Sequence, residues 1–228
     1  MRWMLWVGVV ACTGQTPSTP SQQAPVDAID APTSSALPPM PEVPVSEIGD
    51  IDPGVRLALT ELVNVRVHTL IAPPEKGSEA CHIVEAPDGL WVFDPPRDAG
   101  VLAALHAYQA KLGKSVTWST DHSQDHGGVT PEGVRRMAFL GADGDDVDVF
   151  WWEAEKAWFT GALTAKDVPI LADPEVTADP AHTKAWLASV QALEDRKPDA
   201  VFSGRGKPGD GRVIRSTVAK LRALLEQP

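Results

Sequence analysis

Residues 119–128 read Ser-Thr-Asp-His-Ser-Gln-Asp-His-Gly-Gly, and this stretch is the most informative part of the 228-residue chain. Two Asp-His pairs, Asp121-His122 and Asp125-His126, lie close together and are followed directly by two glycines. Carboxylate oxygens and imidazole nitrogens are common protein ligands of zinc and other transition metals. The stretch therefore has the composition of a metal-binding loop.

The segments on either side of this loop alternate between strand and helix patterns. Residues 62–71 alternate apolar and polar side chains, as a half-buried strand does, and residues 81–94 predict a hairpin that turns at Pro87-Asp88-Gly89. The predicted strands are 62–71, 81–85, 90–94, 115–119, 147–152, 157–160 and 200–203, and the predicted helices are 101–112, 182–193 and 212–225. This order predicts an α+β sandwich with the sheets inside and the helices outside.

Four segments that follow predicted strands carry a family resemblance. They are Asp94-Pro95, Thr120–Gly128, Phe159–Ala162 and Ser203–Pro208. In order and spacing these segments resemble the successive motifs of the metallo-β-lactamase superfamily, over roughly Arg56 to the C-terminus. The resemblance implies a four-layer αβ/βα sandwich. It also implies a zinc site, in which three histidines hold one metal and an Asp and two histidines hold the second.

Most of the ligands that the resemblance implies are replaced in this chain. In active members the loop reads T-H-x-H-x-D-H, the later strand ends in T-G-D, and the last loop reads G-H-G-x-P. A further histidine lies between the second and fourth motifs, but residues 127–160 contain none. The Asp-His pair of the loop survives as Asp125 and His126. The degenerate ligand positions are Asp121 and Ser123 (histidines in the family), Ala162 (the bridging aspartate) and Arg205 (the last histidine).

These replacements predict a pseudoenzyme or ligand-binding protein in which zinc binding is weak or absent. Two surviving ligands, with a third from Asp121, fall short of the coordination that zinc sites use. Arg205 would also repel a metal dication. We expect its guanidinium to substitute for the missing cation and to pair with Asp121 or Asp125. A small molecule is then the expected ligand of the former cleft.

A metal-dependent hydrolase is the alternative function. Asp121, His122, Asp125 and His126 could rearrange into a mononuclear site of mixed oxygen and nitrogen ligands. Asp125 would then help to activate a water for attack on an ester, thioester, amide or phosphoester. A third interpretation is that the segment is a polar surface loop and that the resemblance of the four segments is a coincidence.

The N-terminus predicts export and lipidation. Arg2 precedes the apolar run Trp3–Val10, which is too short to span a bilayer. Val9-Val10-Ala11-Cys12 resembles the lipobox of bacterial lipoproteins, in which the cysteine is acylated. Cys12 is therefore the predicted lipidation site and the membrane anchor. The alternatives are a short uncleaved apolar N-terminus and a mis-assigned start codon.

The rest of the chain divides into a tether and a domain. Residues 13–55 contain no Lys, Arg, Phe, Tyr or Trp and many prolines, so they have little apolar surface to offset the entropy of ordering. The predicted divisions are a signal peptide at 1–11, a Pro/Ser/Thr-rich tether at 12–47 and a metallo-β-lactamase-like domain at 48–228. The protein is expected in the bacterial cell envelope, anchored to a membrane with its domain outside the cytoplasm.

Charge and cysteine content narrow the partners and the chemistry. The net charge is −11, and no stripe of Lys and Arg is present, so nucleic acid is not an expected partner. With Cys12 committed to lipid, Cys81 is the remaining cysteine. A nucleophilic thiol needs a base or cation beside it, and in a strand the neighbouring His82 would point to the opposite face. Cys81 is therefore predicted to be a buried structural residue.

Overall fold

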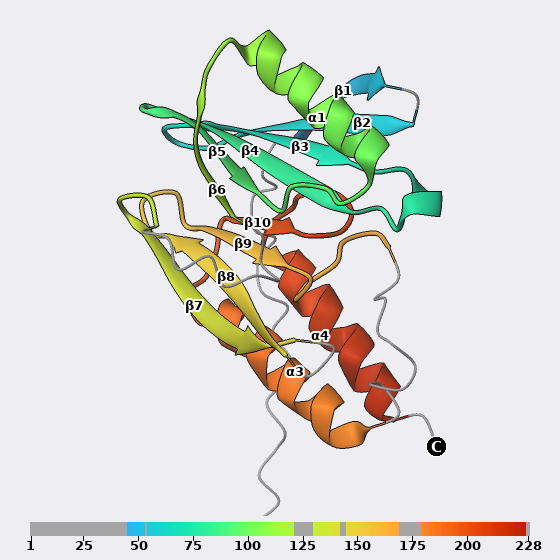
Figure 1. The fold of residues 1–228 in the computed structure, drawn as a ribbon. Coiled ribbons are helices and arrows are strands. Elements are labelled where there is room, and N and C mark those ends of the chain that lie inside the picture. The colour runs from blue at the N-terminus through green and yellow to red at the C-terminus, as the bar shows by residue number, and fades with distance from the viewer. Residues whose placement is uncertain (1–44, 53, 121–129, 142–144, 169–178, 227–228) are drawn as a thin grey trace, which may run out of the picture. The chain divides into compact units, whose positions relative to one another are not determined.

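The chain was analysed as a computed structural model, which describes residues 45–52, 54–120, 130–141, 145–168 and 179–226 (Figure 1). The first sheet has six strands in the order β1-β2-β3-β4-β5-β6. Its neighbours are antiparallel except β5 and β6, which run parallel. The strands are β1 (Val45–Asp52), β2 (Val55–Glu61), β3 (Arg66–Ile71), β4 (Ala80–Ala86), β5 (Gly89–Phe93) and β6 (Val116–Thr120).

The second sheet has four strands in the order β10-β9-β8-β7, of which β10 and β9 run parallel. Its strands are β7 (Val134–Leu140), β8 (Asp146–Trp152), β9 (Ala157–Gly161) and β10 (Ala200–Ser203). The helices are the 3-10 turn η1 (Pro74–Lys76), α1 (Ala99–Leu112), α3 (Pro180–Glu194) and α4 (Arg212–Leu225).

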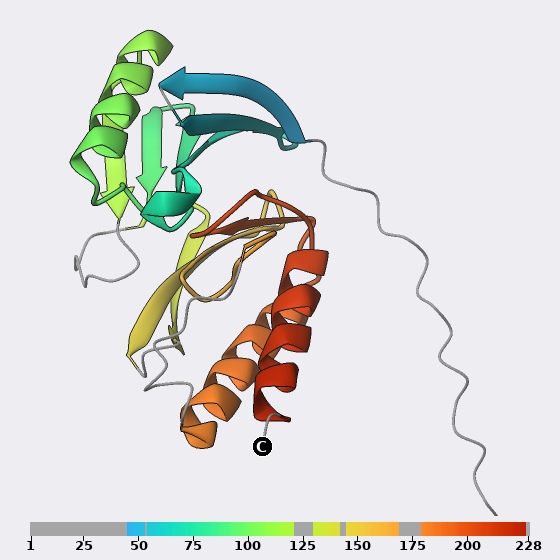
Figure 2. The same cartoon turned by 90° about the vertical axis from the view of Figure 1, so that its right-hand side faces the viewer.

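The elements stack in four layers, with the helices outside and the two sheets inside (Figure 2). Helix α1 covers the outer face of the six-stranded sheet through a cluster that includes Val101 and Leu105. Helices α3 and α4 cover the outer face of the four-stranded sheet through a second cluster, which includes Trp186 and Ile214. A third cluster fills the space between the sheets. The predicted α+β four-layer sandwich is confirmed.

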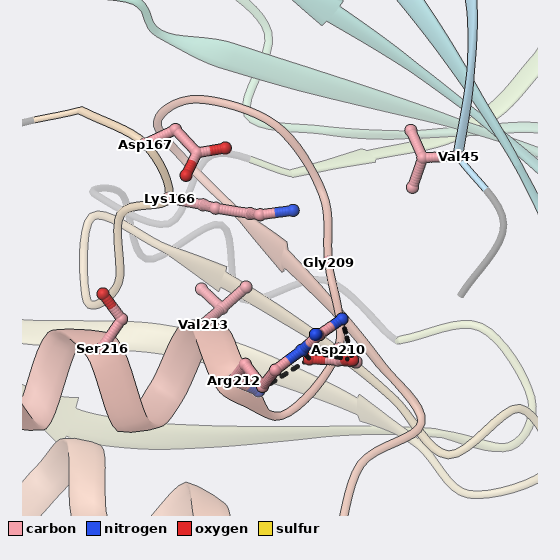
Figure 3. A pocket seen from close by; sticks show the side chains of 8 residues that line it. All are labelled: Val45, Lys166, Asp167, Gly209, Asp210, Arg212, Val213 and Ser216. Carbon is pink, nitrogen blue, oxygen red and sulfur yellow. Dashed lines mark hydrogen bonds and ion pairs between the residues drawn. The ribbon is translucent and has the colours of Figure 1, made fainter. Parts of the chain in front are cut away.

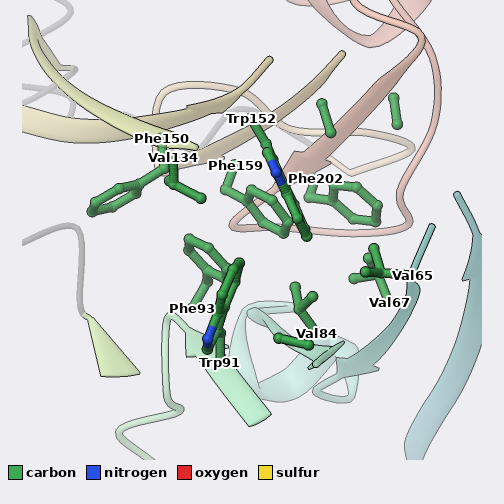
Figure 4. Close-up of a cluster of buried hydrophobic side chains, with 13 residues drawn as sticks. Val65, Val67, Val84, Trp91, Phe93, Val134, Phe150, Trp152, Phe159 and Phe202 are labelled. Carbon is green, nitrogen blue, oxygen red and sulfur yellow. The ribbon is translucent and has the colours of Figure 1, made fainter. Parts of the chain in front are cut away.

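Aromatic side chains form the centre of the cluster between the sheets (Figure 4). The ring of Phe93 on β5 stacks on that of Phe159 on β9, with centroids 3.8 Å apart and planes 5° from parallel. Phe159 in turn stacks on Phe202 of β10 at 4.7 Å. Successive residues of a strand point to opposite faces, so Trp158, next to Phe159, packs on the helical side instead. Alternation along β9 therefore places side chains both in the cluster between the sheets and in the cluster beneath α3 and α4.

The predicted elements agree with the structure in most places. Strand β10 and helix α4 have the predicted bounds, and the predicted hairpin is formed by β4 and β5. Strand β1 begins at Val45, slightly before the predicted start of the domain at residue 48. Strands β1, β2 and β7 were not predicted. Strand β7 lies at a sheet edge with mostly exposed or half-buried side chains, so its sequence, VRRMAFL, shows no clean two-residue alternation.

Candidate functional site

The carboxyl ends of β5, β6, β9 and β10 bring the described parts of the four motifs together at one end of the sandwich, which we call the motif end. On the first sheet, the Asp94 N–H donates to the Thr120 carbonyl at 2.9 Å, because β5 and β6 run parallel and end side by side. On the second sheet, the Gly204 N–H donates to the Gly161 carbonyl at 2.7 Å, where the parallel strands β9 and β10 end. Carboxyl ends of parallel strands are where α/β folds commonly place ligands.

Strand β4 connects these two pairs of strand ends. The Ala80 N–H donates to the Gly204 carbonyl at 2.8 Å, and His82 lies opposite Phe93 in the register of β4 and β5. The fully buried His82 ring places Nε2 3.0 Å from the Ser203 carbonyl and Nδ1 3.0 Å from the Thr69 hydroxyl. A carbonyl only accepts, so Nε2 carries the hydrogen, and in a neutral ring Nδ1 accepts from Thr69. His82 thus joins both sheets directly beneath the Ser203–Arg205 segment.

Sequence reasoning did not identify this role of His82. Its partners come from β3 and β10, and residues Ser203 and His82 are 121 positions apart. The one signal in the sequence is a histidine between the apolar residues Cys81 and Ile83, since a buried imidazole needs hydrogen-bond partners.

Close backbone contacts explain the glycines of the last two motifs. A Cβ added at Gly204 would lie 2.5 Å from the Gly161 carbonyl carbon, and one at Gly206 would lie 1.9 Å from the Lys166 carbonyl oxygen. Gly161 and Gly206 also have φ of +50° and +80°, which favours glycine. These glycines are therefore required by backbone packing, whether or not a metal is bound.

Of the positions predicted to be degenerate ligands, the structure describes Arg205 and Ala162. Arg205 is half-buried, and its Nη1 donates to the Gly77 carbonyl at 3.3 Å. Its main chain forms an antiparallel bridge with Glu79, and its carbonyl accepts from the Lys166 N–H at 3.2 Å. Ala162 is exposed and presents only a methyl group. Neither side chain has a lone pair to offer a metal.

The remaining predicted site residues, namely Asp121, His122, Ser123, Asp125, His126 and Cys12, lie outside the described residues. The ion pair between Arg205 and Asp121 or Asp125 therefore stays a prediction. Within the described ranges, no group of three or more His, Cys, Asp and Glu side chains is arranged to hold a metal ion.

Cys81 is a buried thiol, as predicted. It packs in the cluster beneath α1, whereas His82 contacts Phe159 and Phe202 between the sheets, so the two side chains lie on opposite faces of β4. Burial raises the pKa of the Cys81 thiol well above its ordinary value, and the charge of Asp94 raises it further. A thiol held in its protonated form is a poor nucleophile.

A pocket of about 380 Å³ lies at the start of α4, where Lys166, Asp167 and Val45 of β1 also line it (Figure 3). Arg212 folds back onto the buried Asp210, to which its Nε donates at 2.9 and 3.0 Å. This pairing lowers the pKa of Asp210, although burial alone would raise it. Lys166 extends across the pocket and donates to the Pro208 carbonyl at 3.1 Å. The charges of Arg212 and Asp210 thus balance each other at the wall of the pocket.

Comparisons with solved structures identify the architecture. VMB-1 matches with a TM-score of 0.55 and 15% sequence identity over 73% of this chain and 97% of its own. DIM-1 metallo-β-lactamase matches with a TM-score of 0.53 and 15% identity over 75% of this chain and 98% of its own. FIM-1 metallo-β-lactamase from Pseudomonas aeruginosa, in its mono-zinc form, matches with a TM-score of 0.51 and 14% identity over 81% of this chain and 98% of its own.

The chain has the metallo-β-lactamase fold. At these identities the likeness concerns the fold alone. No family model matches the sequence, and no curated protein matches it. The activity must therefore be argued from the side chains of the site.

Proposed function

We propose that this protein is a degenerate metallo-β-lactamase-fold lipoprotein that binds a small molecule in the former cleft without hydrolysing it. The observation that carries the proposal is the pair Ala162 and Arg205. They lie at the ends of β9 and β10, in segments whose backbones are in direct contact, and neither side chain can ligate a metal. The backbone of the motif end is retained while two donor atoms of the implied centre are replaced.

The described residues do not fit a dinuclear metal centre. A catalytic zinc normally keeps three protein ligands, and the bridging position in this chain is a methyl group. Two unit charges 4 Å apart interact by about 4 kcal/mol at an effective dielectric of 20, so a dication beside Arg205 would be repelled by roughly twice that. The same guanidinium favours a carboxylate, either that of Asp121 or Asp125 or that of a bound ligand.

The proposed setting is the bacterial cell envelope, with Cys12 acylated and residues 12–47 acting as a tether. No described helix is long and apolar enough to cross a membrane. In this proposal the lipid on Cys12 is the membrane attachment. Replacing Cys12 by Ala is expected to abolish incorporation of labelled palmitate and to release the protein from the membrane pellet. Continued pelleting with full labelling would reject the lipid anchor.

The proposed loss of metal ligands is tested by restoring a carboxylate at position 162 and an imidazole at position 205. Zinc binding to the full chain is measured by calorimetric titration, for the native chain and for the variant Ala162→Asp with Arg205→His. We expect the double variant to bind zinc at least about tenfold more tightly than the native chain, because two donors are restored and one cation is removed. The matched control is Ala162→Asn with Arg205→Gln, which removes the same cation without supplying the aspartate and histidine. Equal zinc affinity in all three proteins would count against the proposal.

A mononuclear metal-dependent hydrolase is the second candidate, favoured by the surviving Asp125-His126 pair beside Asp121-His122. The fold accommodates a single zinc in FIM-1, whose structure is of the mono-zinc form. In this candidate the four side chains would hold one metal, which would supply an activated water, and Asp125 would orient that water. Zinc-dependent hydrolysis of an ester or thioester by the native chain, lost in Asp125→Asn, would favour this candidate over the first.

A further inference from the structure

The apolar packing of helix α1 on its sheet is tightest along its first half. Its buried residues are Val101, Ala104 and Leu105, all in the first two turns. In the second half, Tyr108 and Leu112 are partly buried, while His106 and Lys111 are exposed. Apolar burial scales with the area removed from water, so it stabilises the second half of α1 less than the first.

A chain of polar contacts adds to the weaker apolar packing of the second half. The Tyr108 hydroxyl on α1 lies 2.9 Å from Nδ1 of His68 on β3. The other nitrogen of this ring, Nε2, lies 2.8 Å from Oε1 of Glu85 on β4. The second carboxylate oxygen of Glu85 pairs with Nζ of Lys114 at 3.1 Å. Lys114 directly follows Gly113, the left-handed residue that ends α1 and leads into β6.

The direction of these hydrogen bonds depends on the charge of Glu85. An ionised carboxylate only accepts, so Nε2 of His68 carries the hydrogen, and in a neutral ring Nδ1 accepts from Tyr108. His68 is 4% exposed, so little water is available to replace a lost partner. Burial would raise the pKa of Glu85, but the hydrogen bonds from His68 and Lys114 outweigh it and lower the pKa below its ordinary value. Burial, and then the charge of Glu85, raises the pKa of Tyr108, which stays a donor.

Neighbouring charges do not compete for Glu85. Arg66 lies directly opposite Glu85 in the register of β3 and β4, but its Nε is paired with Glu61 at 2.8 Å. Strand β6 carries no charged residue, and the charged side chain in the last turn of α1 is the exposed Lys111. Glu85 is thus the acceptor on which both His68 and Lys114 converge.

We propose that Tyr108, His68, Glu85 and Lys114 form a polar latch that fastens the second half of α1 and the start of β6 to the sheet, and that the latch opens when Glu85 takes up a proton. Strand β6 is an edge strand, and Val116, Thr117 and Ser119 are exposed, so its first residues are held by backbone pairing with β5 and by little side-chain packing. The same strand ends at Thr120, whose carbonyl holds Asp94 at the motif end. Opening the latch therefore loosens one wall of the candidate site without unfolding the opposite helical layer.

The pH range follows from the direction of the shift at Glu85. A carboxyl group with a lowered pKa in the folded protein stabilises it fully above the ordinary value of 4.5. This contribution is lost as the pH falls through the lowered value. The latch is accordingly closed at neutral pH and opens in acid.

Hydrogen exchange of the full chain, measured by mass spectrometry at neutral pH, tests the latch. We expect Glu85→Gln to speed amide exchange in residues 106–120 by about tenfold or more, as loss of hydrogen bonds to a charged group implies, while exchange in α4 stays unchanged. Tyr108→Phe keeps the ring and should speed exchange in residues 106–112 by a smaller factor. The matched control is Asp199→Asn, which removes the carboxylate of an exposed ion pair with Lys156 at the other sheet and should leave residues 106–120 unaffected.

A second measurement on the native chain uses acid itself. After correction for the intrinsic pH dependence of exchange, residues 106–120 should lose protection below about pH 4.5, before α4 does. In Glu85→Gln, the protection of residues 106–120 should no longer change between neutral pH and acid. The latch is rejected if Glu85→Gln and Tyr108→Phe leave residues 106–120 unchanged, or if both speed exchange equally in α4. Neither result would bear on zinc binding, so this test is independent of the proposed function.

Discussion

The interior of the sandwich and its motif end differ in what they have retained. Between the sheets, Phe93, Phe159 and Phe202 stack in an unbroken apolar column. At the motif end, the glycines and backbone hydrogen bonds of the motif segments are in place, but Ala162 and Arg205 carry no metal-ligand atoms. Burial of apolar surface and close backbone packing are sufficient to hold this fold. The chemistry of the motif end can therefore change while the architecture persists.

The largest expected effect is in the interior. Phe159→Ala should lower the free energy of unfolding by about 3–5 kcal/mol, because it removes a fully buried ring that stacks on two others. Urea denaturation followed by circular dichroism measures this loss. Val63→Ala is the control, since Val63 is 84% exposed and should change stability by no more than about 0.5 kcal/mol. Similar losses in the two variants would mean that the aromatic column is not the main support of the fold.

A smaller effect is expected from the backbone of the motif end. Gly204→Ala places a Cβ 2.5 Å from the Gly161 carbonyl carbon, and backbone atoms there have little room to shift. We expect a loss of about 1–3 kcal/mol in the same denaturation assay, the usual cost of overpacking. Ala162→Gly, at an exposed position in the adjoining segment, should change stability less. An unchanged midpoint for Gly204→Ala would show that the two strand ends are not held together as described.

The prediction with the smallest effect concerns charge at the motif end. If Arg205 neutralises Asp121 or Asp125, Arg205→Ala should cost about 1 kcal/mol at low salt and less at high salt, since screening weakens half-exposed pairs. Arg205→Lys keeps the charge and should recover part of the loss. A loss that is independent of salt, or no loss at all, would show that Arg205 does not pair with these carboxylates.

The sequence predicted the sandwich because its signals are local or periodic. The turn at Pro87-Asp88-Gly89, the end of α1 at Gly113 and the apolar face of α4 each depend on neighbouring residues. Edge strand β7 lacked such a signal, because one side of it meets solvent and its apolar residues do not alternate cleanly.

The scaffold of the site was less accessible to sequence reasoning. His82 joins Thr69 to Ser203, and the Tyr108-His68-Glu85-Lys114 latch draws on β3, β4, α1 and the turn after it. These partners meet only when the strands take their places in the sheets, so no spacing in the sequence marks them. Ala162 and Arg205 were proposed as former ligand positions because they follow recognisable strand-end motifs. The ligand positions proposed at 121–126 lie outside the described residues and stay predictions.

Metal analysis of the full chain, purified without chelators and then dialysed in zinc-containing and zinc-free buffer, asks whether the protein holds a zinc ion. We expect inductively coupled plasma mass spectrometry to find far less than one zinc per chain after dialysis in zinc-free buffer. We also expect Asp125→Ala and His126→Ala to leave this value unchanged. One zinc per chain that survives dialysis, and that is lost in either variant, would contradict this expectation and establish a working metal site.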